Sequence, residues 1–261
     1  MSVNSHLTNL ASSLVISDKE NLSIFTSGIT LELRLNLYFG NIVTEHFQFG
    51  SNTRGTILPR AADRYSDIDY MVVFNTSNSQ MKPQTYLNNL KIFVEKKYSK
   101  SEIYQSHPTI VLSLNHIKFE LVPAINNYGY QIPSSASDWN EWMNTDPSGI
   151  NQRLQAANKN NNFQIKPLVR LIKYWNKKNG NPFSSFSLEE YIISKLFWGC
   201  STLKDYFYFF WTDFNCQYNT PQYKKNMVDR AKQCIRQARD YENSNMPMTA
   251  EVEIKKIVPS L

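Results

Sequence analysis

Two aspartates, Asp67 and Asp69, stand at the head of an almost wholly apolar run that ends at Phe74. Residues two apart on a strand project from the same face, so both carboxylates would lie together while Ile68 points to the opposite face. Two anions this close repel each other, and a site that keeps both charged at neutral pH usually holds a cation too. Because hard oxygen ligands favour magnesium or manganese, the pair predicts a divalent metal site.

Spacing alone is weak support, because the chain has four acid-x-acid pairs: Asp18/Glu20, Asp67/Asp69, Asp240/Glu242 and Glu251/Glu253. The Asp67 pair differs from the others in opening an apolar strand. A third carboxylate, Glu120, lies in the predicted strand "IKFELVPAI", with Ile117, Phe119 and Leu121 on the opposite face. Three acids on adjacent strands can hold two metal ions about 3.5–4 Å apart, which activate an attacking hydroxyl and stabilise a leaving pyrophosphate. The alternative for Glu120 is a solvated strand residue beside Lys118.

A Gly-Ser pair, Gly50 and Ser51, ends the strand that precedes the aspartates. Glycine would let the backbone approach a phosphate closely, and the serine with the following amides can bind phosphate oxygens. A Gly-Ser dipeptide carries little information by itself. Its position here predicts a turn that holds the triphosphate whose metal ions the aspartates bind.

Composition limits the class of protein. With 261 residues and 41% hydrophobic content, the chain can bury one large core or two small ones. No run approaches the roughly 18 apolar residues of a membrane span, and no basic region precedes the first apolar residues, so we expect a soluble, cytoplasmic protein. The three cysteines, Cys200, Cys216 and Cys234, lack CxxC spacing and predict reduced thiols. A net charge of +6 favours anionic partners such as nucleotides or nucleic acid, although it also suits simple solubility.

The first half of the chain has an α+β pattern. Ser17 and Glu20 form a capping-box signature before a long helix over residues 18–39, which would brace the following elements. The patterns predict a second helix over about 84–98 and strands over 42–49, 68–74, 102–106, 109–114 and 117–123.

After about residue 150 the pattern becomes helical, which predicts two domains, 1–150 and 151–261. The segment "FQIKPLVRLIKYWNKKNG" has one apolar face, formed by Leu168, Leu171, Ile172 and Trp175, and a basic stripe of Lys166, Arg170, Lys173 and Lys177. Gly180 is its predicted C-cap. Further helices are predicted over about 187–198, 202–211 and 223–241.

These residues resemble a known family. "FGS" followed by "TRGT", then "SDIDYMVVF" and "FELVPA", resembles the polymerase-β-type nucleotidyltransferases, and among them the bacterial cGAS/DncV-like enzymes, or CD-NTases. "KPLVRLIKYWNKKN" followed by "SSFSLEEY" is similar to the segments that close over the donor nucleotide in this family and in its 2′-5′-oligoadenylate synthetase relatives. The resemblance implies an α+β, polymerase-β-like core with a mixed sheet and a long bracing helix. It also implies a helical C-terminal lobe, with a cleft between the two.

The resemblance also implies roles for individual residues. Gly50 and Ser51 would bind the triphosphate; Asp67, Asp69 and Glu120 would hold two Mg²⁺ or Mn²⁺ ions; Lys173 would reach the phosphates, Ser185 would add a hydroxyl, and Phe186 would stack on the base. For Lys173, Ser185 and Phe186 there is an alternative interpretation. Lys173 could belong to a solvated stripe, Phe186 could be core, and Ser185 or Ser187 could cap a helix, with Ser187 and Glu190 forming a capping box.

The function implied is a metal-dependent joining of nucleoside triphosphates (ATP, GTP or pyrimidine NTPs) into a cyclic dinucleotide or short cyclic oligonucleotide, with release of pyrophosphate. This second messenger would act on a downstream effector protein in bacterial anti-phage signalling. The chain would act as a monomer without a membrane, and, since no zinc-binding insertion of Cys and His is evident, without activation by nucleic acid. The family usually has aspartate where this chain has Glu120. Transfer to RNA or a small molecule, and a silent nucleotide-binding module, remain alternatives.

Overall fold

The computed structural model describes residues 2–77, 79–106, 108–134 and 141–261. The chain divides into two compact units. The sheet unit comprises Ser17–Gly55 and Tyr65–Asn151, and the helical unit comprises Met1–Ile16, Thr56–Arg64 and Gln152–Leu261. This division differs from the predicted domains 1–150 and 151–261 because two early segments, residues 1–16 and 56–64, pack with the helices of the second half.

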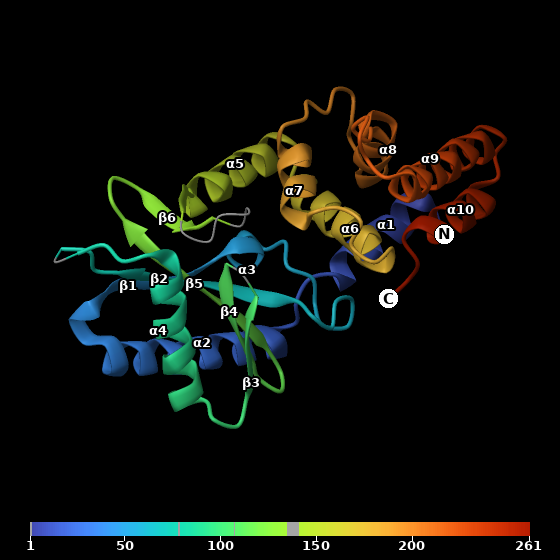
Figure 1. The fold of residues 1–261 in the computed structure, drawn as a ribbon. Coiled ribbons are helices and arrows are strands. Elements are labelled where there is room, and N and C mark those ends of the chain that lie inside the picture. Colours follow the sequence, from blue (N-terminus) through green and yellow to red (C-terminus); the bar gives the residue numbers. More distant parts are fainter. Residues whose placement is uncertain (1, 78, 107, 135–140) are drawn as a thin grey trace. The chain divides into compact units, whose positions relative to one another are not determined.

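A mixed sheet forms the centre of the sheet unit (Figure 1). Within the described residues it has seven strands, five of them in the order β1 (Val43–Phe49), β2 (Asp67–Phe74), β5 (Lys118–Asn126), β4 (Thr109–Ser113) and β3 (Glu102–Ser106). The strands β2 and β5 are parallel, and the other neighbours are antiparallel. Two short strands that the sequence did not predict, β6 (Tyr130–Pro133) and β7 (Trp142–Asn144), continue from the end of β5.

Two helices, α2 (Asp18–Phe39) and α4 (Pro83–Lys97), pack against the sheet, as predicted. The Ser17 side chain accepts a hydrogen bond from the Glu20 amide at 3.2 Å, which starts α2 at the predicted residue. The ring of Phe74 on β2 lies 5.4 Å from Phe39 of α2 and 4.8 Å from Tyr86 of α4. These helices therefore cover the sheet face that carries the even-numbered residues of β2.

The opposite face carries the odd-numbered residues of β2, which begin with the two aspartates. Farther along this face, Met71 and Val73 pack with Ala124 of β5 in a small apolar cluster. The carboxylates thus lie at one end of a face whose other end is apolar. A short helix, α3 (Gly50–Arg54), follows β1 directly and contacts β2 at the acidic end.

The helical unit is built from helices, of which only some were predicted from the sequence. They are α1 (Val3–Ser13), α5 (Pro147–Asn160), which begins in the sheet unit, α6 (Ile165–Lys178), α7 (Ser185–Ile193), α8 (Leu203–Asp213), α9 (Gln222–Asn243) and α10 (Pro247–Ile257). The predictions for α6 to α9 are confirmed, with α7 ending earlier than expected, whereas α1, α5 and α10 were not predicted. The apolar face of α6 is buried as predicted, and its Trp175 ring lies 4.7 Å from Trp211 of α8. The predicted C-cap of α6 is one residue off, because Asn179 is the cap and Gly180 follows it with φ +77°.

The three cysteines are free thiols, as predicted. Across the described parts of the chain, every helix is too short or too polar to cross a membrane.

Candidate functional site

Strand pairing brings the three predicted carboxylates to one face of the sheet unit. Along the parallel pair β2–β5, Asp69 pairs with Glu120 and Asp67 pairs with Lys118. Alternate residues of a strand share a face, so all three acids project from the same side. On the other side of the sheet Ile68 is buried, with 1% of its surface exposed. The common face predicted from the spacing is therefore confirmed, while the roles of the residues stay predictions.

The carboxylate of Asp69 lies against the backbone of Gly50. Gly50 has φ +75°, and a Cβ atom added to it would lie 1.8 Å from Oδ2 of Asp69. Only glycine leaves room for the aspartate at this close approach. The pair Gly50–Ser51 begins the short helix α3 instead of forming the turn that the sequence predicted. The two residues are nevertheless adjacent to the acids, because Phe49, which precedes them, pairs with Asp69 across β1 and β2.

The other two carboxylates share the ammonium group of Lys118. Its Nζ lies 3.1 Å from Oδ2 of Asp67 and 3.0 Å from Oε1 of Glu120. The exposed fractions of the three side chains are 17% for Lys118, 37% for Asp67 and 22% for Glu120. Lys118 is close to Glu120 in the sequence. Its contact with Asp67 could not be predicted, because that contact depends on the pairing of β2 with β5.

The environment shifts the pKa of both partners on β5. Burial, and next the negative charge of Asp67, raise the pKa of the Glu120 carboxyl, although Lys118 opposes the shift. For Lys118, burial acts to lower the pKa of the ammonium, but the charge of Asp67 and the contact with Glu120 outweigh it and raise the pKa. The lysine therefore remains charged at neutral pH and partly balances the acids. Glu120 is not the solvated strand residue of the alternative interpretation.

The donor chemistry of this face suits a hard divalent cation, because carboxylate oxygens are the ligands that Mg²⁺ and Mn²⁺ prefer. The side chains are not converged on one point: Asp69 is directed to Gly50, and Asp67 and Glu120 are directed to Lys118. Accordingly, among the described residues no three His, Cys, Asp or Glu side chains form a metal-binding group. The three acids project from one face, which suits binding of a cation by their carboxylates. Their side chains would have to rotate toward one point to ligate it.

Three further predicted site residues lie in the helical unit. Lys173 on α6 has 9% of its surface exposed, so it is not part of a solvated stripe. Ser185 is the first residue of α7, and the N-cap is Ser184, whose Oγ accepts from the Ser187 amide at 3.3 Å. The predicted capping box at Ser187 is therefore wrong. Phe186 is 50% exposed and is not a core residue.

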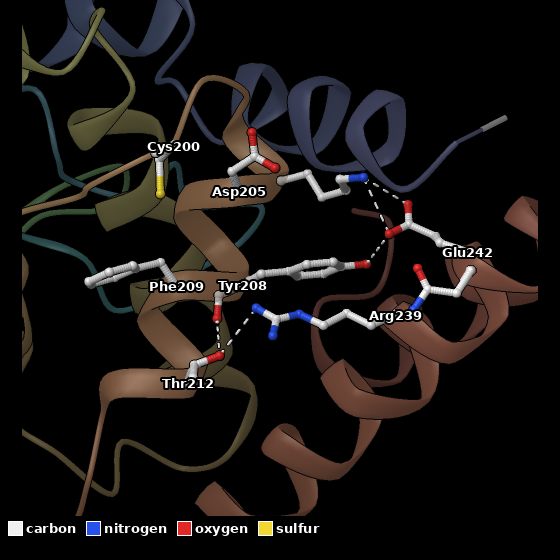
Figure 2. Close-up of a pocket in the computed structure, with 10 residues that line it drawn as sticks. Cys200, Asp205, Tyr208, Phe209, Thr212, Arg239 and Glu242 are labelled. Carbon is white, nitrogen blue, oxygen red and sulfur yellow. Dashed lines mark hydrogen bonds and ion pairs between the residues drawn. The ribbon is translucent and has the colours of Figure 1, made fainter.

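A hollow of about 390 Å³ lies between α8 and α9 (Figure 2). Two of its charged groups form an ion pair: Lys204 Nζ lies 3.1 Å from Oε1 of Glu242, to whose Oε2 the Tyr208 hydroxyl donates at 3.2 Å. Arg239 lies over the Tyr208 ring at 5.1 Å and donates to Oγ1 of Thr212 at 3.2 Å. We interpret these contacts as a polar junction between the two helices, distinct from the carboxylate face.

The mixed sheet, the long helix α2 and the carboxylates on adjacent central strands are the features of a polymerase-β-like nucleotidyltransferase core. Comparison with known proteins specifies the family. Residues 1–158 match the Second Messenger Oligonucleotide or Dinucleotide Synthetase domain, and the chain belongs to this family. The resemblance to the CD-NTases is thereby confirmed.

Solved structures share this fold at low sequence identity. The Vibrio cholerae dinucleotide cyclase DncV superposes with a TM-score of 0.72 at 11% identity, covering 91% of each chain. The CdnC protein of Escherichia coli MS115-1, solved with ATP, gives a TM-score of 0.70 at 14% identity over 98% of each chain.

Two curated relatives match parts of the sequence. A probable cyclic nucleotide synthase of Bacillus cereus (strain VD146) is 33% identical over 115 residues, which are 39% of this chain and 34% of the relative. A cyclic AMP-AMP-AMP synthase of Acinetobacter sp. (strain ATCC 27244 / 9458) is 26% identical over 154 residues, 56% of this chain and 43% of the relative. The matched region thus spans less than half of the length of either relative.

Proposed function

We propose that this chain is a metal-dependent nucleotidyltransferase that joins nucleoside triphosphates into a cyclic dinucleotide or short cyclic oligonucleotide and releases pyrophosphate. The observation that carries the proposal is the pairing of Asp69 with Glu120, with Asp67 on the same face and Gly50 against Asp69. This arrangement supports the proposal, because three carboxylates lie on one face directly beside a helix that begins with glycine. Membership of the synthetase family supports the same reaction class.

In the proposed site, Asp67, Asp69 and Glu120 hold two Mg²⁺ ions, for which Mn²⁺ can substitute. When bound, the ions supply Lewis-acid activation of an attacking hydroxyl and neutralise charge on the departing pyrophosphate. Gly50 and Ser51 bind the triphosphate. The strands fix the backbone positions of the three acids, which is what would let them orient a bound substrate.

In the helical unit, the ammonium of Lys173 neutralises charge on the triphosphate, and Ser185 contributes a hydroxyl to the phosphate oxygens. Phe186 offers an exposed aromatic ring on which a base can stack. The burial of Lys173 favours a specific role over a solvated one, because burying an ammonium group costs free energy unless an interaction offsets its desolvation.

ATP is the first substrate to test, since one curated relative is a cyclic AMP-AMP-AMP synthase and one solved neighbour was determined with ATP. A further neighbour, from Bradyrhizobium diazoefficiens, was solved with GTP, which makes GTP the second. We propose that the product acts as a second messenger for an effector protein in anti-phage signalling in the cytoplasm, and that the synthase works as a monomer.

The direct test is to incubate the protein with radiolabelled ATP, GTP, UTP or CTP and Mg²⁺ or Mn²⁺, then with phosphatase, and to separate the products by chromatography. We expect a phosphatase-resistant product that disappears in Asp67→Asn and Asp69→Asn. Glu45→Gln is a matched control, because Glu45 lies at the far end of β1 and contacts Tyr130. Product within about tenfold of wild type in either aspartate variant would contradict the metal assignment.

The same assay separates the alternatives. A product that requires added RNA or a small hydroxyl compound would indicate a different acceptor. Triphosphate binding by calorimetry without product from the wild type, together with activity in Glu120→Asp, would show that the glutamate silences the site. The chain would then be a nucleotide-binding module.

A further inference from the structure

The ammonium of Lys118 contacts two of the three proposed metal ligands. It reaches Asp67 on β2 at 3.1 Å and Glu120 on its own strand at 3.0 Å. These contacts follow from the fold, because Lys118 pairs with Asp67 across the parallel strands and lies two residues from Glu120 on the same face. The lysine is therefore a fixed part of the acidic face.

This pairing differs from an ordinary surface ion pair. Lys91 and Glu95 on α4, for comparison, lie 3.8 Å apart and have side chains 46% and 53% exposed. Such pairs contribute little, because water screens them. Lys118 is 17% exposed and joins two strands, so its interaction with the acids is stronger and its position is better defined.

A lysine at this place conflicts with a bound divalent ion. An ammonium group has donors but no acceptor, so it cannot be a ligand, and it uses the carboxylate lone pairs that an ion needs. A divalent ion close to the ammonium would also be repelled by it. Metal binding by Asp67 and Glu120 therefore requires the ammonium to withdraw from them.

We infer that Lys118 is a built-in counter-cation that competes with the divalent ion for Asp67 and Glu120 and thereby sets the metal affinity of the site. The inference rests on the proposed function, since it takes these carboxylates as metal ligands. It goes beyond that function in assigning a role to a residue that binds neither metal nor phosphate in the proposal. In the absence of nucleotide the site holds its own cation, and its affinity for the free ion is correspondingly low.

The test measures Mn²⁺ binding to the whole chain without nucleotide, by the loss of the free Mn²⁺ signal in electron paramagnetic resonance. Lys118→Gln and Lys118→Met remove the charge and keep much of the side-chain length. We expect both to bind Mn²⁺ about tenfold or more tightly than wild type, the scale typical of residues that contact metal ligands. Lys118→Arg, which keeps the charge, should stay near wild type, as should the control Lys91→Gln. Adding Asp69→Asn to Lys118→Gln should abolish the tight site.

Mn²⁺ affinity in Lys118→Gln and Lys118→Met that is equal to or weaker than that of wild type would overturn the competition. No Mn²⁺ binding by any of these proteins would overturn both the inference and the metal assignment. Tighter binding in both variants, without product from the wild type in the triphosphate assay, would uphold the inference and reject the proposed reaction.

Discussion

At the scale of single residues, Gly50 and Asp69 depend on each other. The backbone of Gly50 adopts a positive φ, and the space that a side chain would fill is taken by the Asp69 carboxylate. The glycine thus has a role in the protein even without a phosphate, because it allows a charged group to lie against the start of α3. Any substitution at position 50 must move Asp69, the central acid of the face.

Gly50→Ala should therefore reduce product formation by about 100-fold or more, because displacement of a catalytic group by about 1 Å has effects of this size. Gly180→Ala is a matched control, since Gly180 has a similar φ of +77° but no atom within 4 Å of an added Cβ. Both variants should lose stability from backbone strain, measured as the midpoint of thermal unfolding, and Gly50→Ala should lose more because it also displaces Asp69. An equal effect of both on product formation would contradict the role given to the Gly50–Asp69 contact.

The sequence was sufficient to predict the carboxylate face, because the strand period fixes which side chains share a side. It could not predict Lys118, whose contact with Asp67 arises from the register between strands about fifty residues apart in the chain. It also could not predict that Gly50 faces Asp69. In both cases the missing information was the pairing of elements that are distant in the sequence.

At the scale of elements, α6 presents polar residues that are not solvated. Arg170 donates to the carbonyl of Ala11 at 3.3 Å, and Lys177 lies 2.7 Å from Asp63. Lys173, between them, is nearly buried. The predicted basic stripe is thus part of the packing of the helical unit.

We expect Lys173→Met, which keeps the apolar stem and removes the charge, to weaken ATP binding about tenfold or more while the protein stays folded. Lys177→Met should leave ATP binding nearly unchanged, although it removes the ion pair with Asp63. Calorimetry with a non-hydrolysable ATP analogue measures the affinity, and circular dichroism checks the fold. Equal losses of affinity in the two variants would show that the charge of α6 acts as a whole and that Lys173 has no specific role.

The start of α8 offers a test of local electrostatics. Thr202 caps the helix, and Asp205 completes a capping box by accepting from the Thr202 amide at 2.8 Å. Burial acts to raise the pKa of Asp205, but the hydrogen bonds from Thr202 and Ser201 outweigh it, and the pKa lies below its ordinary value of 3.8. A carboxylate with a lowered pKa stabilises the folded state above pH 3.8, and this contribution is lost as the pH falls through the folded-state pKa.

Asp205→Asn should consequently lower the free energy of unfolding at pH 7 by about 1 kcal/mol, the usual size of a capping effect. The difference from wild type should shrink as the pH is lowered from 4 toward about 3. Urea unfolding at pH 7 and across this lower pH range measures the difference in the free energy of unfolding. Asp18→Asn, in the first turn of α2, is the control. A difference that is constant across this range would mean that the charge of Asp205 does not stabilise the cap.

Elements with strong local signals were predictable, and the others were not. The capping residues Ser17 and Glu20 fixed the start of α2, and the apolar period of α6 fixed its buried face. The helix α1 was missed because its partners, α6, α8 and α10, all lie in the second half of the chain. For the five-residue helix α3, the segment is too short for a periodic pattern.

At the scale of the whole molecule, the helical unit is assembled from three separate segments of the chain. The N-terminal helix α1 packs against α6, α8 and α10. Its apolar residues are buried among them, with Leu7 at 0% exposure. The core formed by the helices of the second half therefore also requires the first sixteen residues.

Leu7→Ala should destabilise the helical unit by about 2–5 kcal/mol, the cost of a cavity in a closed core. Leu37→Ala is the control, because Leu37 on α2 is 85% exposed and should change stability by less than about 0.5 kcal/mol. Guanidinium unfolding followed by tryptophan fluorescence includes the signal of this unit, since Trp175 and Trp211 lie in its core. A small loss for Leu7→Ala would show that α1 is only loosely attached.

The packing of α1 also bears on how the protein is made. The ring of His6 hydrogen-bonds to the carbonyl of Val258 at 2.8 Å, so α1 completes its packing only after the segment around Val258 has been translated. At about 5–20 residues per second, translation of the intervening chain takes roughly 12–50 s, during which the packing of α1 is incomplete. The sheet unit ends at Asn151 and has all its residues well before that time. Nascent chains of this protein are therefore expected to need a chaperone at α1, and slow translation of the second half would lengthen that need.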